Sequence, residues 1–218
     1  MLKILKNQED VISGLIVCEE MGNASALPLV LHFLSAASTS NQKVTIVTSK
    51  FTETNYKLIC SKAGIRWSSS LISFLDILSP FESFDVTSKK IMEDTYEKIV
   101  ETGSSVILFD DLSIFEQMGS TAAELTVFVH KIHSHLKKST SEPVTVLAPF
   151  SVSSASCSLL RSRCRVFAQL TPVGHGFGKD ASSKVALTIK APSSSTTKKG
   201  IILSGERTIN GSWITVDQ

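Results

Sequence analysis

Short, continuously apolar segments alternate along most of this chain with segments in which apolar residues recur every three or four positions. Segments of the first kind, such as Val106-Ile-Leu-Phe109, are typical of strands buried on both faces, and segments of the second kind are typical of amphipathic helices. Strands covered by helices on both faces occur in parallel sheets. The alternation therefore predicts an α/β fold with a mostly parallel sheet flanked by helices.

The expected elements follow one another as pairs of a strand and a helix up to residue 163. Strands are predicted at 12–18, 43–49, 71–78, 105–109 and 144–148, and helices at 25–37, 52–63, 86–101, 120–138 and 156–163. After that point only strand signals remain, at 166–170, 184–190, 200–204 and 213–216. Turn-rich segments separate these last strands, so we expect a C-terminal antiparallel β extension at one edge of the sheet.

Length and composition indicate one globular domain. The chain has 218 residues, of which 42% are hydrophobic and 19% charged, and this balance excludes disordered and fibrous classes of protein. We expect a single domain over 1–218, with a mobile hairpin tip at about 192–199, where Ser, Thr and Lys predominate. No apolar run approaches the roughly 18 to 20 residues that span a bilayer, so no membrane partner and an intracellular location are expected.

The charges are unevenly distributed between the two halves of the chain. Residues 1–111 carry ten Lys and Arg against fourteen Asp and Glu, whereas residues 112–218 carry twelve against six. A basic second half can indicate an anionic partner. The alternative is chance clustering on a solvated surface, because the imbalance is modest beside that of dedicated nucleic-acid binders.

The segment after the first predicted strand lacks the groups of a phosphate-binding loop. Such a loop needs several glycines, a lysine that neutralises the phosphates and a Ser or Thr that holds Mg²⁺. Residues 18–25 read Cys-Glu-Glu-Met-Gly-Asn-Ala-Ser, with one glycine and no lysine. The two glutamates would repel a triphosphate, and only weak anion contact is expected at the start of the helix, which Ser25 is predicted to cap. The residues of this degenerate loop are Glu19, Glu20, Gly22, Asn23 and Ser25.

Asp110 and Asp111 follow an apolar strand in the manner of the acidic residues that hold the Mg²⁺ shell in ATPases. Without a lysine and a hydroxyl partner, they have no nucleotide to serve. The favoured alternative is that both carboxylates end a parallel strand and bond to neighbouring loops or cap the helix that begins near Leu112. No nucleotide cofactor is therefore expected.

Other catalytic and metal-binding patterns are missing as well. His130 and His133 share a helix face, but His135 points elsewhere and no Cys, Asp or Glu stands at ligand spacing, so no metal site is predicted. The chain has no Gly-x-Ser-x-Gly elbow, and neither Cys157 nor Cys164 lies in the context of a catalytic thiol. The four cysteines are scattered singly and are expected to be reduced thiols. We expect no catalytic residues and no enzymatic activity.

Two longer blocks of sequence carry a family resemblance. Residues 106–119, Val-Ile-Leu-Phe-Asp-Asp-Leu-Ser-Ile-Phe-Glu-Gln-Met-Gly, resemble the signature of Elongator complex protein six: an apolar strand, Asp-Asp-Leu-Ser, a short apolar helix and a glycine. Residues 165–180, Arg-Val-Phe-Ala-Gln-Leu-Thr-Pro-Val-Gly-His-Gly-Phe-Gly-Lys-Asp, resemble the same family, as do 32–34 and 71–78. The chain departs from the family in a short stretch before residue 86 and at 193–199.

The resemblance implies a RecA-like fold without a working phosphate-binding loop. Members of that family alternate with Elongator proteins four and five in a heterohexameric ring, an accessory part of Elongator that binds tRNA and is required for wobble-uridine modification. The catalytic chemistry belongs to another subunit, and the location implied is the cytoplasm or also the nucleus. Two other functions stay open: a stand-alone regulatory adaptor on a degenerate ATPase fold, and an active RecA-type ATPase.

A ring subunit is expected to use apolar surface that a monomer would leave exposed. The short helix after Asp111 is one candidate, because its apolar residues have little acidic or basic cover, and a glycine-flanked turn around Phe177 is another. The predicted interface residues are Leu112, Ile114, Phe115, Met118 and Phe177.

Basic residues near the C-terminal strands are candidates for contact with RNA. Arg161, Arg163 and Arg165 alternate, so in an extended segment they would project to one side. Lys179 lies in a glycine-rich loop, and Lys198 and Lys199 lie on the hairpin tip, where flexible side chains suit phosphate contacts. The alternative is that the arginines pair with acidic residues across the subunit interface.

Overall fold

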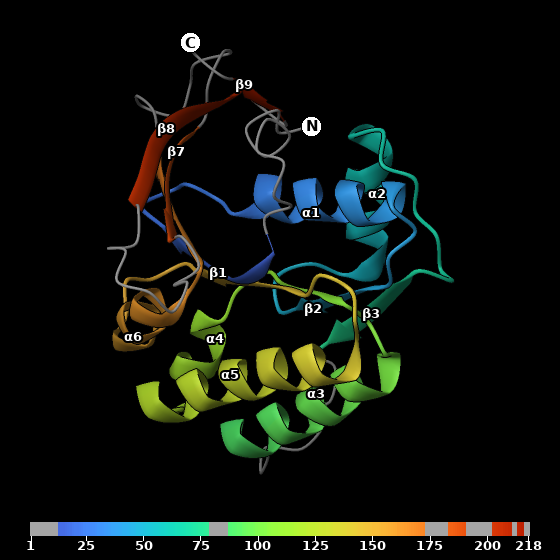
Figure 1. Ribbon diagram of the computed structural model, residues 1–218, viewed down its shortest axis with the longest axis vertical. Coiled ribbons are helices and arrows are strands. Elements are labelled where there is room, and N and C mark those ends of the chain that lie inside the picture. Colours follow the sequence, from blue (N-terminus) through green and yellow to red (C-terminus); the bar gives the residue numbers. More distant parts are fainter. Residues whose placement is uncertain (1–12, 79–86, 173–182, 191–201, 211–212, 216–218) are drawn as a thin grey trace.

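The computed structural model describes residues 13–78, 87–172, 183–190, 202–210 and 213–215 (Figure 1). The predicted hairpin tip at about 192–199 lies outside these ranges. So do four of the predicted site residues, Phe177, Lys179, Lys198 and Lys199.

Within the described residues, nine strands form one sheet in the order β3-β2-β4-β5-β1-β6-β7-β8-β9. The first six strands are parallel to one another, and they are β1 Gly14–Glu20, β2 Val44–Thr48, β3 Ile72–Asp76, β4 Val106–Phe109, β5 Thr145–Phe150 and β6 Val166–Pro172. The last three are antiparallel, and they are β7 Ser183–Lys190, β8 Ile202–Asn210 and β9 Trp213–Thr215. The predicted mostly parallel sheet with an antiparallel C-terminal extension is confirmed.

The helices cover both faces of the sheet (Figure 1). One face carries α1 Leu27–Thr39 and α2 Glu53–Lys62. The other carries α3 Ser88–Thr102, α4 Ser113–Gln117, α5 Ala122–Ser139 and α6 Ala155–Arg163. Alternate residues of the central strand supply the two cores: Ile16 and Cys18 pack on the α1 side, and Leu15 and Val17 pack on the α5 side. Helices on both faces explain why the parallel strands read as continuous apolar runs.

Local capping places most helix ends near their predicted positions. Thr121 accepts from the amide of Glu124, whose carboxylate accepts in turn from the amide of Thr121, so a reciprocal capping box starts α5. Gly103 follows α3 with a φ of 59°, in the left-handed region where a glycine commonly ends a helix.

The start of α1 differs from the prediction. Ala26, not Ser25, is the N-cap, because the helix begins two residues later than expected, at Leu27. The hydroxyl of Ser25 accepts a bond from the amide of Leu27 at 3.2 Å instead of capping the first turn.

No helix in the described ranges is both long enough and apolar enough to span a bilayer.

Candidate functional site

Charged and polar residues follow four neighbouring strands of the sheet at their carboxyl ends. Glu20 ends β1, Lys50 follows β2, the Asp110–Asp111 pair follows β4, and Ser151 follows β5. The carboxyl ends of parallel strands meet at one edge, which is where α/β proteins of this kind bind their ligands. This edge is the place where a nucleotide site would be built.

Glu20 occupies the anion position at the start of α1. The amide of Ala26 donates a hydrogen bond of 2.6 Å to Oε1 of Glu20, whose side chain is almost fully buried. The chain returns toward α1 through Gly22, which has a φ of 58°, a conformation that favours glycine. Free amides and the helix dipole make this point attractive to a phosphate oxygen. The protein's own carboxylate therefore takes the place of that phosphate.

Lys50 neutralises two of the carboxylates in the site. Its Nζ lies 3.2 Å from Oε2 of Glu20 and 3.2 Å from Oδ2 of Asp111. Burial alone lowers the pKa of Lys50, but the Asp111 and Glu20 carboxylates outweigh it and hold the pKa above its ordinary value. Lys50 is thus a fixed positive charge that comes from the loop after β2, and it faces the protein's own acidic groups.

Asp110 is tied to the loop after β2. Its carboxylate accepts from the hydroxyl of Thr48, from the amide of Ser49 at 2.9 Å and from the amide of Lys50 at 3.1 Å. Burial raises the pKa of Asp110, and these hydrogen bonds offset part of that rise. Both oxygens are engaged by the protein, as expected for a carboxylate that ends a parallel strand and fixes a neighbouring loop.

Asp111 is tied to the start of α4 and to the end of β5. Its Oδ1 accepts from the amide of Ser113 at 2.8 Å and from the amide of Ser151 at 3.3 Å. Its Oδ2 accepts from the hydroxyl of Ser151 at 2.6 Å, in addition to the contact with Lys50. These are bonds to a helix start and to a neighbouring loop, the two structural roles weighed for this residue.

The arrangement opposes nucleotide binding on electrostatic grounds. Among the described residues of the site, Glu20, Asp110 and Asp111, counted as ionised, outnumber the cation Lys50. Glu19 on the same strand end is also buried, and its carboxylate accepts from the side-chain amide of Gln169 at 3.0 Å. A triphosphate would have to displace the Glu20 carboxylate from the helix and leave that charge without its donor. It would also enter a site of its own sign.

Lys50 is the site residue that the sequence did not reveal. A phosphate-binding lysine is expected in the loop after β1, whereas Lys50 follows β2 and lies 30 positions from Glu20 along the chain. A usable signal existed, because charged residues directly after parallel strands converge at one edge of the sheet. Within the loop after β1, the amide of Ala24 donates to the carbonyl of Met21 at 3.1 Å. The amide of Ala24 is therefore already engaged within the loop.

The short helix α4 corrects part of the predicted interface. Leu112 and Phe115 are fully buried in the core beneath α5, so they do not form apolar surface on the isolated chain. The ring of Phe115 lies 5.5 Å from that of Phe128, centre to centre. Ile114 and Met118 are partly buried and pack against the same core. The helix lacks charged cover because it faces the protein interior.

The three arginines do not alternate along one extended segment. Arg161 and Arg163 lie in the last turn of α6, and only Arg165 lies on the extended chain that enters β6. The guanidinium of Arg161 stacks over the ring of Phe167 at 4.1 Å, whereas Nη1 of Arg165 donates to the carbonyl and hydroxyl of Ser13 at 3.3 and 3.2 Å. The prediction that these side chains project to one side is wrong, because the helix continues through Arg163.

The histidines of α5 are not assembled into a metal site in the described part of the chain. There, no group of three or more His, Cys, Asp or Glu side chains is placed to hold a metal ion. Burial lowers the pKa of His133 to about 4, with further contributions from Lys137 and His130. His135 instead contacts the ring of Tyr96 edge-on, at 5.9 Å between centres.

The cysteines should be inert in the folded protein. All four are buried free thiols, and burial raises the pKa of Cys157 to about 12 and that of Cys60 to about 11, so these two have almost no thiolate at pH 8. We predict that the folded chain reacts with DTNB at least about a hundredfold more slowly than the chain in urea, where all four thiols react together. Rapid labelling of one thiol in the folded chain would contradict this.

Comparison with known proteins supports the fold and nothing finer. No protein-family model matches the sequence, and no curated protein matches it either. Among solved structures, the chain is similar to the flagellar accessory protein FlaH from Methanocaldococcus jannaschii, with a TM-score of 0.68 and 14% identity, over 99% of this chain and 95% of that one. At this level of identity the likeness shows the fold alone, which is RecA-like.

Proposed function

We propose that this chain, which has a RecA-like fold, is a non-catalytic subunit of the heterohexameric Elongator accessory ring, which binds tRNA and supports modification of the wobble uridine. Its ring partners are then Elongator proteins four and five, and through the ring it meets the remainder of Elongator and tRNA. The proposal joins the resemblance of residues 106–119 and 165–180 to the chemistry of the candidate site.

The observation that carries the non-catalytic part is the contact of Glu20 with the start of α1. A carboxylate that accepts from the amide of Ala26 and pairs with Lys50 leaves neither donor free for a phosphate. The carboxylate oxygens of Asp110 and Asp111 accept hydrogen bonds from neighbouring loops, and Asp111 also pairs with Lys50. Little of their charge is therefore available to a Mg²⁺ ion. The charged groups at this edge of the sheet are therefore bound to one another and to the loops, which supports a structural role for them.

Exposed apolar side chains near Glu20 support the proposal that ring neighbours bind at this edge of the sheet. The register of β1 and β5 pairs Glu19 with Phe150, so Met21 and Val152 follow two neighbouring strand ends. Both are exposed, at 38% and 54% of their surface. Exposed apolar side chains at one edge of the sheet support a protein partner there better than the buried Leu112 and Phe115 do.

The decisive experiment is co-expression with Elongator proteins four and five, followed by size-exclusion chromatography with light scattering. We expect a particle of about six chains, as closed rings of this type require. The variant Val152→Arg should reduce the recovery of that particle, since it places a charge in the apolar contact. Leu58→Arg is the matched control, because Leu58 on α2 is exposed to a similar extent, 57%. The control should assemble normally.

The same experiment separates the other functions. A chain that stays monomeric beside its candidate partners would be a stand-alone adaptor, and the ring proposal would fall. Titration of the isolated chain with Mg-ATP addresses the second alternative: saturable binding with turnover would show an active ATPase in spite of Glu20. Equal loss of assembly in the Val152→Arg and Leu58→Arg variants would show that Val152 is not a specific interface residue. The proposal that the chain is a ring subunit would not be affected.

A further inference from the structure

We propose that a cavity is a binding site for a phosphate group. It lies at the edge of the sheet opposite to Glu20 and the loop between β1 and α1. The cavity has a volume of about 690 Å³ and lies where the amino-terminal ends of β1 and β6 meet the carboxyl-terminal ends of α5 and α6. It is distinct from the loop described above, and it does not depend on the proposed ring.

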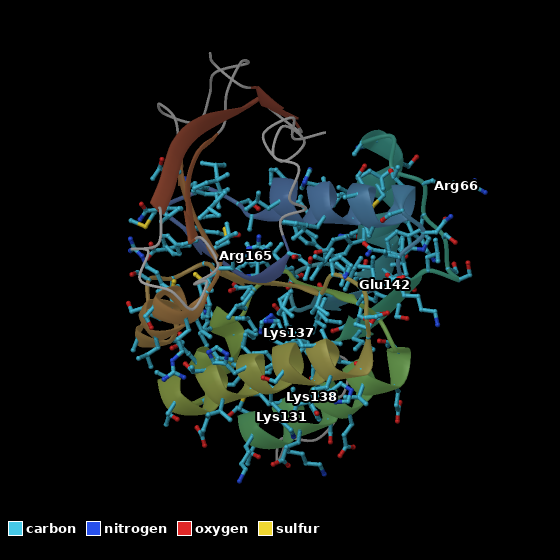
Figure 2. All side chains as sticks on the ribbon, in the orientation of Figure 1. Arg66, Lys131, Lys137, Lys138, Glu142 and Arg165 are labelled. Carbon is cyan, nitrogen blue, oxygen red and sulfur yellow. The ribbon has the colours of Figure 1, made fainter. Side chains whose placement is uncertain are left out.

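Basic side chains from three different elements line the cavity. Lys137 comes from the last turn of α5, Arg163 from the last turn of α6, and Arg165 from the segment that enters β6. Figure 2 labels Arg165 beside the sheet, Lys137 on α5 and Glu142 on the segment that joins α5 to β5. Elements far apart in the sequence thus bring three cations to one concave surface.

These cations are not neutralised by the part of the chain that the structure describes. In that part, Lys137, Arg163 and Arg165 take part in no ion pair. Among the described residues, Glu142 is the one acidic residue that lines the cavity, and its carboxylate accepts from the side-chain amide of Gln42 at 3.3 Å. An unpaired cluster of this kind attracts an anion, and arginine in particular presents donors that match phosphate oxygens.

The helix ends explain some of the basic residues but not the balance of charge. Lys137 and Arg163 lie where cations favour a helix carboxyl terminus, and each such terminus carries roughly half a negative charge. Three cations against Glu142 and two helix ends still leave an excess of about one positive charge. Arg165 lies on neither helix, so the helix dipoles do not account for it.

His133, which lines the cavity, also carries an unsatisfied polar atom. Nε2 of His133 is buried and has no hydrogen-bond partner in the described part of the chain. It lies 4.0 Å from the point where a Cβ on Gly14 would be, and the side chain of Arg165 lies 3.6 Å from the same point. Gly14 has a φ of 101°, a conformation that only glycine adopts readily, so no side chain separates the two groups there.

The chemistry favours a phosphate group rather than a nucleic-acid base or an apolar ligand. Charged and hydroxyl side chains form much of the lining, and among the described residues it contains no Phe, Tyr or Trp on which a base could stack. The phosphate could come from a small phosphorylated compound or from an RNA backbone, and these two sources share the same recognition chemistry.

Calorimetric titration with inorganic pyrophosphate at about 0.15 M chloride tests the site, because that ionic strength screens weak surface attraction. The unmodified chain should bind with one-to-one stoichiometry. The double variant Lys137→Glu, Arg163→Glu should bind about tenfold more weakly or worse. The control Lys138→Glu, Lys62→Glu changes the net charge equally at exposed positions outside the cavity, and it should stay within about threefold of the unmodified chain.

A direct measurement on the unmodified chain guards against variants that fail to fold. Saturating pyrophosphate should shift the NMR ring resonances of His133. The ring resonances of His32, which is buried on α1, should not change. Absence of saturable binding, equal loss in both double variants, or a shift confined to other histidines would overturn the proposal. Competition by a short RNA hairpin, lost in the Lys137→Glu, Arg163→Glu variant, would assign the phosphate to RNA; no competition would assign it to a small compound.

Discussion

Replacing Phe115 by alanine is expected to lower the free energy of unfolding by about 3 to 5 kcal/mol, as for other fully buried phenylalanines. Phe115 has no exposed surface and lies in the core between α4 and α5. Its ring contacts Phe128, which in turn lies 6.1 Å from Phe109 on β4, so its removal opens a cavity within a row of aromatic rings. Urea unfolding followed by circular dichroism measures the change.

Val127→Ala is the matched control, because Val127 lies on α5 near the same rings but is 65% exposed. It should change the free energy of unfolding by no more than about 0.5 kcal/mol. A Phe115→Ala chain that is as stable as the unmodified protein and yet fails to join its partners would restore Phe115 as an interface residue. If the first expectation holds, loss of assembly in this variant reports misfolding of the subunit and not a lost contact.

Lys50→Ala is expected to cost about 2 to 4 kcal/mol of stability, because it leaves the Glu20 and Asp111 carboxylates without their common cation. Both carboxylates are nearly buried, with 5% and 7% of their side chains exposed, whereas Lys50 itself is 33% exposed. Water can reach the lysine side of the cluster, so the loss should be smaller than that for a completely buried pair. The same urea titration at pH 7 measures it.

Lys57→Ala serves as the control, since Lys57 pairs with Glu53 across one turn of α2 at 2.9 Å and both side chains are about half exposed. That surface pair should be worth no more than about 0.5 kcal/mol. Adding Glu20→Gln to Lys50→Ala should recover part of the loss, because a neutral amide oxygen still accepts from Ala26 without needing a counter-ion. Equal small effects of Lys50→Ala and Lys57→Ala would show that the cluster does not hold the loop.

Much of the architecture could be predicted from local patterns. The apolar run at 106–109 predicts a buried strand, and the three-to-four spacing of apolar residues in 122–139 predicts which face of a helix meets the core. Both the strand and the helix occur where expected. The site was predicted less well. The degenerate loop was evident from its missing lysine and glycines, but the group that fills it was not, because a local pattern does not say which strand ends are neighbours.

Errors about individual residues have the same origin. The apolar face of α4 was interpreted as an interface because its sequence shows no charged cover, but whether such a face meets a partner or the protein's own core depends on what lies above it. Here α5 covers it. Likewise, the alternation of Arg161, Arg163 and Arg165 has meaning only if the chain is extended, and the turn of α6 through Arg163 removes it.

The sequence by itself determined the fold class and the lack of a phosphate-binding loop, because burial periodicity and missing side chains are local properties. The tertiary structure alone decided which charges meet. Placing β1 between β5 and β6 brings Arg165 beside His133 at one edge of the sheet, and the order β2-β4-β5-β1 brings Lys50 between Glu20 and Asp111 at the other. Contacts between residues 30 to 61 positions apart depend on strand order, which long-range packing selects and no short segment encodes.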